Sequence, residues 1–372
     1  MSLNGETLRA SHPLGRWSTA LVLCLALPLL GVGSVPAMAA PAERPTTPDT
    51  SATQPDAERP EATPLRVASF NIRCANCSIN SRVNGREKKW ETRRHAVIAQ
   101  IKAEQVDVIG VQEASPGLLR GRKISQFEDL AARLGEPYEL TNQHRYPCAR
   151  STSHRSCSRR DNGASGDSRI LYNTERLTLL DQGSKQLDNE KLTSGPRFVA
   201  WAIFADKTDG REFVFATAHT EPGQTKAKRK LRTTQAKLIL AELERANPNG
   251  LPVIITGDFS ASKLTAANPV YDVLIGSDVV VDPLGNSKRK KSTKDAIVER
   301  LINIKYNTLN NFKAKPKSQK GYALGAHLDY IFTAPGIEVP EYKVVLKLKS
   351  NGAFAGTIPS DHNMVRATVL LP

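Results

Sequence analysis

An acidic residue and a histidine stand side by side near the carboxyl end of this chain, at Asp361-His362. An alternating apolar run, residues 364–371, follows them and predicts a strand. A carboxylate beside an imidazole at the end of a strand can bind a metal ion and also handle a proton. The pair therefore marks this strand end as a candidate hydrolytic site.

Five further acid, amide or imidazole side chains stand at the ends of other expected strands. They are Asn71, Glu113, His219, Asp258 and Asp329. A rigid sheet can direct several side chains to one point from its strand ends, so a site would be built there. Each residue alone has a structural explanation as a cap, turn or core residue. Together with the Asp-His pair they indicate a divalent-metal hydrolase.

The expected metal ligands are oxygen atoms. Glu113 and Asp361 offer hard carboxylate ligands and Asn71 offers a neutral one. This set suits Mg²⁺ or Mn²⁺. Three ligands are too few for a closed protein cage, which leaves room for water and a substrate phosphate.

From Leu65 onward the sequence alternates between strand and helix patterns, without a repeat or a second linker. The expected strands are 65–72, 106–111, 168–172, 177–180, 198–204, 212–218, 251–256, 328–333, 342–348 and 364–371. The expected helices are 89–102, 118–134 and 226–245. This order favours one α/β domain of layered sheets with helices outside.

The first 64 residues predict export rather than folded structure. Two arginines precede the apolar stretch 20–27, and Ala37-Met38-Ala39 fits a signal-peptidase site. A membrane anchor is the alternative, but prolines leave the apolar run short of the roughly 20 residues that a span needs. We expect 1–39 to be a secretory signal peptide and the protein to be extracellular. Residues 40–64 are rich in proline and acidic residues and predict a flexible linker, so 65–372 form the single domain.

Export also bears on the cysteines that remain in the mature chain, which are Cys74, Cys77, Cys148 and Cys157. An even number in an oxidising compartment predicts two local disulfides, Cys74–Cys77 and Cys148–Cys157. A structural zinc site is the alternative, because Cys-x-x-Cys is also a ligand spacing and His144 and His154 flank the second pair.

The net charge of +15 and the pI of about 9.6 indicate a polyanionic partner or a negatively charged surface. The basic residues gather in segments 145–160, 226–230, 288–291 and 313–317. Solvated surface is the alternative explanation for such runs. The lysine runs lack interleaved aromatic residues, which favours contact with a phosphate backbone over stacking on bases.

The order of the motifs resembles the endonuclease/exonuclease/phosphatase family. The motifs are Ser69-Phe70-Asn71, Gly110-Val111-Gln112-Glu113, Ala218-His219-Thr220, Gly257-Asp258-Phe259, Leu328-Asp329-Tyr330-Ile331 and Ser360-Asp361-His362. The resemblance covers residues 65–371. It implies the DNase I-like fold, a four-layered α/β sandwich of two facing mixed β-sheets flanked by helices.

The resemblance also implies roles for the site residues. Asn71, Glu113 and Asp361 would hold the metal.

Asp258 would orient or deprotonate the attacking water. Asp329 would hydrogen-bond one nitrogen of His362 and favour its charged form. His362 and His219 would contact the phosphoryl oxygens from two sides.

One position departs from the family's pattern of Gly-Asp-x-Asn, because Ser260 stands in place of the asparagine. A serine hydroxyl is shorter than the amide but can still donate one hydrogen bond. Ser262 or a water molecule is an alternative donor. Loss of such a donor costs on the order of 10² in rate if nothing replaces it.

We therefore expect a secreted, monomeric, Mg²⁺- or Mn²⁺-dependent nuclease that tolerates any sequence and hydrolyses nucleic-acid phosphodiester bonds. A sphingomyelinase- or phospholipase C-like enzyme that acts on membrane lipid through the loop 352–356 is one alternative. A phosphatase for small phosphoesters is another. A non-catalytic module that binds polyanions is the third.

Overall fold

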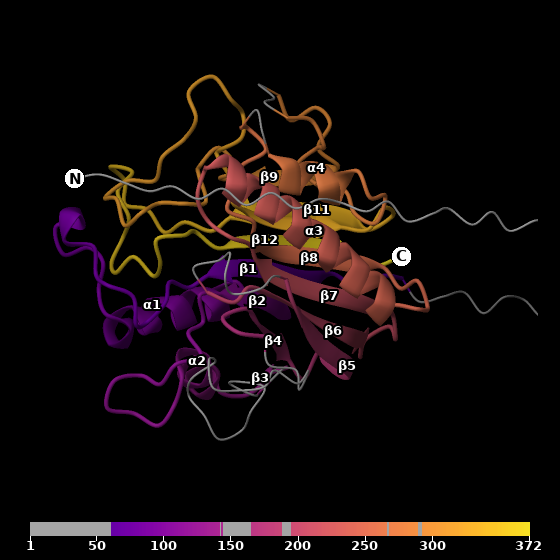
Figure 1. Ribbon diagram of the computed structural model, residues 1–372, viewed down its shortest axis with the longest axis horizontal. Helices are drawn as coiled ribbons and strands as arrows, with labels where there is room; N and C mark the ends of the chain where they lie inside the picture. Colours follow the sequence, from indigo (N-terminus) through magenta and orange to yellow (C-terminus); the bar gives the residue numbers. More distant parts are fainter. Residues whose placement is uncertain (1–60, 142, 144–164, 188–194, 266–267, 289–291) are drawn as a thin grey trace, which may run out of the picture. The chain divides into compact units, whose positions relative to one another are not determined.

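A computed structural model describes residues 61–372, apart from 142, 144–164, 188–194, 266–267 and 289–291 (Figure 1). The chain divides into two units, 1–57 and 58–372, and all described residues belong to the second. The expected signal peptide, most of the expected linker and the expected Cys148–Cys157 pair lie outside the described residues. The arginine-rich segment 145–160, with the zinc alternative that involves His144 and His154, does so as well.

The described residues form two mixed β-sheets that face each other. The larger sheet has the order β3-β4-β2-β1-β12-β11-β9 and the smaller one β10-β8-β7-β6-β5. The strands of the larger sheet are β1 (Leu65–Asn71), β2 (Val108–Gln112), β3 (Tyr138–Leu140), β4 (Arg169–Asn173), β9 (Val298–Ile302), β11 (Glu338–Val344) and β12 (Val365–Leu370). Those of the smaller sheet are β5 (Leu177–Gln186), β6 (Phe198–Asp206), β7 (Glu212–His219), β8 (Val253–Asp258) and β10 (Asp329–Thr333).

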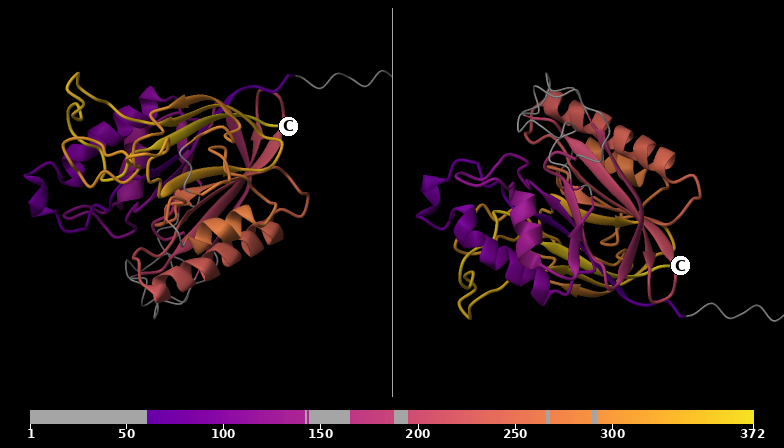
Figure 2. Two further views of the ribbon diagram at one scale, coloured as in Figure 1. Left: turned by 90° about the horizontal axis from the view of Figure 1, so that it is seen from above. Right: turned by 90° about the horizontal axis from the view of Figure 1, so that it is seen from below.

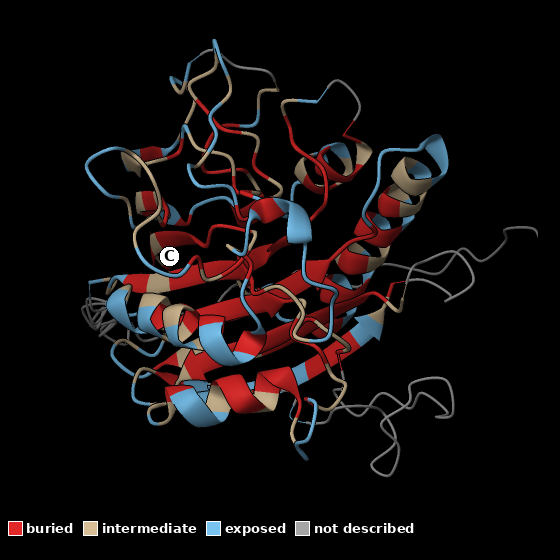
Figure 3. Ribbon diagram, turned by 90° about the vertical axis from the view of Figure 1, so that its left-hand side faces the viewer, coloured by how far each residue is buried: buried red, intermediate tan, exposed pale blue. Residues whose placement is uncertain are grey.

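Helices cover the outer face of each sheet. α1 (Trp90–Ala103) and α2 (Gln126–Leu134) lie on the larger sheet, and α3 (Lys226–Ala246) and α4 (Pro269–Ile275) lie on the smaller one. A short 3₁₀ helix, η1 (Ser81–Val83), precedes α1. Figure 2 shows the resulting order of helix, sheet, sheet and helix, and Figure 3 shows that the strands are buried while the helices expose their outer faces. The structure confirms the expected four-layered α/β sandwich.

Side-chain alternation along the strands assigns each residue to one core. In β1, Leu65 and Val67 pack between the two sheets, whereas Ala68 and Phe70 pack outward against α1 and α2. Asn71 follows Leu65 and Val67 at the same two-residue period. Phe215, Ile254 and Ile331 also lie between the sheets. The same two-residue period places His219 on β7, Asp258 on β8 and Asp329 on β10 on this inner face. The polar side chains therefore cap one end of the inner core.

The two sheets approach closely beneath these polar residues. A Cβ atom on Gly110 of β2 would lie 2.3 Å from Thr217 Oγ1 of β7 and 2.5 Å from Thr256 Oγ1 of β8. Only glycine fits in that space. The close approach sets the side chains of one sheet within hydrogen-bond reach of those of the other.

The structure corrects the bounds of three expected elements. The strand expected over 177–180 is longer, because β5 continues to Gln186. The helix expected over 118–134 begins only at Gln126, because Ser125 caps it in a capping box with Glu128 and Gly121 upstream has a φ of +70°. The strand expected over 342–348 is β11, which runs from Glu338 to Val344. The short elements β3, β9 and α4 were not expected.

The end of the expected linker is anchored to the domain. The backbone and the hydroxyl of Thr63 donate hydrogen bonds of 3.1 and 2.8 Å to Asp209, in the turn between β6 and β7. Among the described residues, no helix has the length and apolar character needed to cross a bilayer.

Candidate active site

Asp258 stands at the centre of the polar cluster. Its Oδ2 atom accepts a 3.0 Å hydrogen bond from the Asn71 amide, which reaches across from the other sheet. The Nε2 atoms of His219 and His362 each lie 3.7 Å from the same oxygen. Strand register explains the gathering, because Asp258 on β8 pairs directly with His219 on β7 and with Asp329 on β10.

His362 is held as a cation by the two carboxylates beside it. Its Nδ1 atom lies 2.8 Å from Asp329 Oδ2, a buried contact, and its Nε2 atom faces Asp258. Burial alone would lower the pKa of His362, but the charges of Asp329 and Asp258 raise it well above its ordinary value. Burial raises the pKa of Asp329. His362 therefore presents an N–H donor to the space beside Asp258.

Asp258 is kept as an anion. Burial disfavours its charge, but the positive charges of His362 and His219 lower its pKa below the ordinary value. The backbone N–H of Ser260 adds a 2.8 Å hydrogen bond to Oδ1. Gly257 lets β8 approach β7 here, because a Cβ atom on it would lie 2.1 Å from the Ala218 carbonyl oxygen. An ionised carboxylate with an oxygen facing two imidazoles can orient a water molecule and accept its proton.

His219 has its own pair of charged partners. Asp167 Oδ2 lies 3.2 Å and Arg197 Nη1 lies 3.0 Å from its Nδ1 atom. Burial and the Arg197 charge oppose protonation, but Asp167 and Asp258 outweigh them and raise the pKa of His219. Arg197 is held in turn by Glu221 at 3.3 Å. His219 thus offers a second donor on the opposite side of Asp258 from His362.

The Ser260 hydroxyl is engaged away from the site. It donates a 3.2 Å hydrogen bond to the backbone carbonyl of Thr220 and is buried. The residue has a φ of +51°, a left-handed conformation that serine adopts less readily than asparagine. Ser262, the other candidate donor, accepts a hydrogen bond from the Leu264 amide at 3.3 Å.

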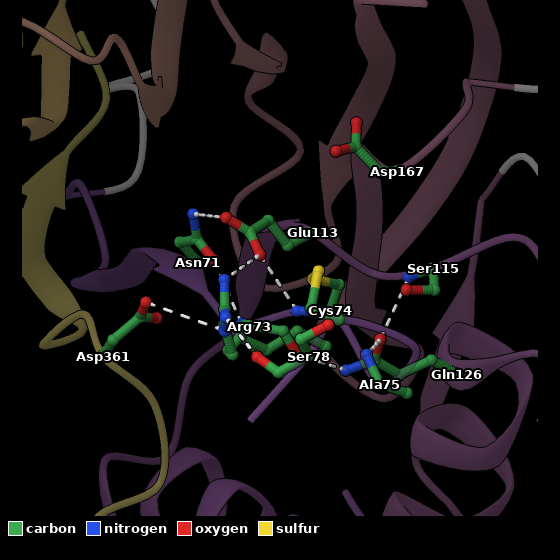
Figure 4. The surroundings of a disulfide bond; sticks show 12 residues. Asn71, Arg73, Cys74, Ala75, Ser78, Glu113, Ser115, Gln126, Asp167 and Asp361 are labelled. Atoms are coloured by element: carbon green, nitrogen blue, oxygen red, sulfur yellow. Dashed lines mark hydrogen bonds and ion pairs between the residues drawn. A yellow bond between two sulfur atoms is a disulfide. The ribbon is translucent and has the colours of Figure 1, made fainter. Parts of the chain in front are cut away.

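Figure 4 shows the other half of the site, where Glu113 and Asp361 lie on either side of the Arg73 guanidinium. Arg73 approaches each of the two carboxylates to 3.8 Å, and its Nε atom lies 3.2 Å from the buried Glu87. Asn71 joins the two halves, because its amide also donates to Glu113 at 3.2 Å. Burial raises the pKa of Asp361, and the Glu113 charge adds to this effect. The space between these carboxylates therefore favours positive charge.

A disulfide lies directly beside Glu113. Cys74 and Cys77 are bonded, as expected from the sequence, and the backbone N–H of Cys74 donates a 3.0 Å hydrogen bond to Glu113 Oε2 (Figure 4). Glu113 itself has a φ of +56°, an uncommon conformation for a residue other than glycine. The disulfide-bonded loop thus helps to aim the Glu113 carboxylate.

The chemistry of the candidate donor atoms shows which residues could hold a metal ion. In the described part of the chain, two groups of three ligand-type side chains come within 4.8 Å: Asp258, Asp329 and His362, and then Cys74, Cys77 and Glu113. A charged imidazole has no lone pair to donate, and disulfide sulfurs are not thiolates, so neither group is a complete site. The oxygens of Asn71, Glu113 and Asp361 remain, and they fit a hard divalent cation such as Mg²⁺ or Mn²⁺.

A buried arginine from α1 ties the two loops of the site together. Arg93 donates to the carbonyls of Ile72 and Arg73 after β1, and to that of Pro359 at 3.2 Å before the Asp-His pair. Burial lowers its pKa to about 10. The Ser360 hydroxyl donates a further 2.7 Å hydrogen bond to the Asn71 carbonyl. These contacts fix the distance between Asn71 and Asp361.

The structure brings all eight site residues expected from the sequence to one end of the inner core. It adds four residues that sequence reasoning did not find, which are Arg73, Arg93, Asp167 and Arg197. Only Arg73 had a signal, since it follows a strand end two residues after Asn71. Asp167 and Arg197 precede β4 and β6 and reach the site through the packing of those strands.

Comparison with known proteins agrees with this geometry. A model described as "Endonuclease/Exonuclease/phosphatase family" matches residues 68–362. Nocturnin of Drosophila melanogaster is 25% identical over 194 residues, which cover 51% of this chain and 27% of that protein.

Two solved structures have the same fold. An endonuclease/exonuclease/phosphatase family protein from Bacteroides thetaiotaomicron aligns with a TM-score of 0.61 at 22% identity, over 84% of this chain and 99% of that one. A mannosyl-6-phosphatase from the same species aligns with a TM-score of 0.57 at 21% identity, over 82% and 100% of the two chains.

Proposed function

The chain belongs to the endonuclease/exonuclease/phosphatase family, and we propose that it is an exported, divalent-metal-dependent phosphodiesterase that cleaves nucleic acid without regard to sequence. The main support for this proposal is the environment of Asp258. Its ionised carboxylate lies between two imidazoles whose pKa values are raised, opposite a set of oxygen ligands. This arrangement suits an in-line attack of water on a phosphorus atom.

The residues divide the reaction between them. Asp258 orients the water and accepts its proton, while Asn71 holds that carboxylate in place at 3.0 Å. His362 and His219 donate hydrogen bonds to the phosphoryl oxygens as negative charge builds there. A divalent ion held by Glu113, Asp361 and Asn71 would supply Lewis-acid polarisation of a phosphoryl oxygen.

Nucleic acid is the substrate that the charge of the chain favours. The net charge is +15, and each phosphate that a basic side chain neutralises adds binding free energy. Export is supported by the apolar stretch 20–27 and by the Cys74–Cys77 disulfide, which persists in oxidising compartments. We propose that the protein acts as a monomer.

A small-phosphoester phosphatase is the second candidate. The fold that the chain shares with a mannosyl-6-phosphatase favours it. The substrate must therefore be tested directly.

The test is a parallel assay of the purified protein on several phosphoesters, each with Mg²⁺, with Mn²⁺ and with EDTA. The substrates are supercoiled plasmid, an RNA oligomer, bis(p-nitrophenyl) phosphate, p-nitrophenyl phosphate and sphingomyelin vesicles. We expect metal-dependent nicking of the plasmid and hydrolysis of the diester. Hydrolysis of the monoester or of sphingomyelin alone would overturn the nuclease assignment, and no hydrolysis of any substrate would overturn the enzyme assignment.

A further inference from the structure

Most of the net charge of the chain lies in three loops, residues 78–89, 305–328 and 345–359, which we call the basic rim. They contain eleven lysines and arginines and one acidic residue, a net charge of +10 against +15 for the whole chain. The acidic residue is Glu87, which is buried and pairs with Arg73 at 3.2 Å. The rim therefore presents a surface of almost unmixed positive charge.

The three loops are packed together rather than independent. A small apolar cluster joins them through one or two side chains from each, which are Val83, Phe312, Phe354 and Ile358. Arg86 Nε donates a 2.8 Å hydrogen bond to the Phe312 carbonyl, and the Phe354 amide donates one of 2.9 Å to the Ala314 carbonyl. The rim is thus one built surface.

This surface is attached directly to the candidate active site. The backbone N–H groups of Asn310 and Asn311 donate hydrogen bonds of 2.6 and 2.9 Å to the Asp361 carbonyl. Glu87 holds Arg73, which lies between Glu113 and Asp361. In Figures 1 and 2 the indigo loop before α1 and the yellow loop before β12 meet at the same end of the domain.

The lysines at 313–317 have no acidic partners in the described part of the chain. Within the described residues, Lys313, Lys315 and Lys317 are exposed and form no ion pair. Lys228 pairs with Glu221 and Lys288 pairs with Asp272, whereas the exposed Lys226 and Lys230 have no ion pair among the described residues. The lysine charges at 313–317 are therefore available to an external anion.

Two of these lysines approach each other closely. The positive charge of the nearby Lys317 lowers the pKa of Lys313. Two neighbouring ammonium groups repel each other, and an anion bound between them offsets that repulsion. A phosphate bound there would relieve that repulsion.

We propose that the basic rim, with Lys313, Lys315 and Lys317 at its edge, binds the phosphate backbone of a nucleic acid beside the active site. The inference rests on the proposed function and names the surface that would hold its substrate. Backbone contacts of this kind carry no sequence information, which is consistent with sequence-tolerant cleavage.

An anionic membrane is a less suitable partner for the rim. Membrane-binding loops expose apolar side chains, whereas Phe312 and Ile358 are buried here and Phe354 is packed against them. Among the described residues, Ile79 is the only large apolar side chain of the rim that is well exposed, at 44%.

The experiment compares Lys313→Gln/Lys315→Gln/Lys317→Gln with the wild type and with two control variants. One control, Lys102→Gln/Lys207→Gln/Lys237→Gln, removes the same charge from exposed lysines outside the rim. The other, Lys313→Arg/Lys315→Arg/Lys317→Arg, keeps the rim charge. Binding of a 20-base-pair duplex is measured by fluorescence anisotropy in EDTA, so that no cleavage occurs, across a range of KCl concentrations.

We expect the rim variant to reduce the slope of log K against log salt by roughly 2 to 3 and to weaken binding at least about tenfold at low salt. The two controls should bind like the wild type. Equal slopes for the rim variant and the Lys102/Lys207/Lys237 control would overturn the proposal. So would rim-dependent binding to phosphatidylserine vesicles without binding to the duplex.

Hydrolysis of bis(p-nitrophenyl) phosphate separates this inference from the proposed function. The substrate lacks the neighbouring phosphates of a nucleic-acid strand that the rim would bind, so the rim variant should hydrolyse it at the wild-type rate. If the wild type fails to hydrolyse it while duplex binding still depends on the rim, the proposed function fails and the rim assignment stands. If the wild type hydrolyses it but duplex binding does not depend on the rim lysines, the proposed function stands and the rim assignment fails.

Discussion

The Oδ2 atom of Asp258 lies 3.7 Å from the Nε2 atom of His362, and neither residue adjoins the other in sequence. The other ring nitrogen of His362, Nδ1, lies 2.8 Å from Asp329 Oδ2. The charge of Asp329 favours the charged form of the imidazole. Burial and neighbouring charges thus give the two groups opposite roles. Asp258 stays ionised and can accept a proton, whereas His362 keeps its proton and can donate a hydrogen bond to phosphate.

The first prediction concerns stability against pH. The pKa of His362 is raised in the folded state by Asp329, Asp258 and Asp361, whereas in the unfolded chain it is about 6.5. The folded state therefore holds a proton that the unfolded state releases. The resulting stabilisation is fully present below about pH 6.5 and is lost as pH rises through the folded pKa.

We therefore expect the difference in unfolding free energy between the wild type and His362→Gln, measured by urea denaturation in EDTA, to shrink between pH 6.5 and pH 9. His95→Gln, an exposed site on α1, is the control for the loss of an imidazole as such. A difference that stays constant over this range would show that His362 is not held as a cation.

The second prediction concerns Ser260. Because its hydroxyl donates to the Thr220 carbonyl, we expect Ser260→Ala to lower stability by about 1 kcal/mol and to leave kcat nearly unchanged. We expect Ser260→Asn to raise kcat by up to about 10²-fold, because an amide can reach the phosphate and asparagine tolerates the positive φ. Steady-state kinetics on a phosphodiester checks both variants. A collapse of kcat in Ser260→Ala would mean that the hydroxyl itself acts on the substrate.

The third prediction concerns the Cys74–Cys77 disulfide. Loss of the bond frees the loop whose Cys74 amide donates to Glu113. Partners that orient metal ligands typically contribute 10- to 100-fold in affinity, so we expect Cys74→Ser/Cys77→Ser to weaken Mn²⁺ binding by about tenfold. Calorimetric titration of Mn²⁺ measures this directly. Reductant should reproduce the effect in the wild type and add nothing to the variant, and an unchanged Mn²⁺ affinity would separate the disulfide from the metal site.

Much of the site could be predicted because its residues obey strand periodicity. Asn71, His219 and Asp258 each continue the inward-facing alternation of a strand to its end, so their convergence follows from the sheets facing each other. The local helix start at Ser125 also had a readable signal, the capping box with Glu128, which outweighs the apolar spacing upstream.

The supporting residues could not be predicted, because their positions depend on packing between distant segments. Arg93 lies inside a helix and looks like an ordinary surface arginine until α1 docks and directs it at the carbonyls after β1. Arg197 and Asp167 meet at His219 only because β4, β6 and β7 come together. No spacing along the chain encodes these contacts.

The most direct test of the account is plasmid nicking by Asp258→Asn in saturating Mn²⁺, compared with the wild type. The substitution keeps the shape of the side chain and removes the group that accepts the proton of the water. We expect a rate loss of about 10²- to 10⁴-fold in a variant that is still folded at the assay temperature, as judged by circular dichroism. Asp278→Asn, an exposed site, should nick like the wild type. Wild-type nicking by folded Asp258→Asn would contradict the central role given to Asp258.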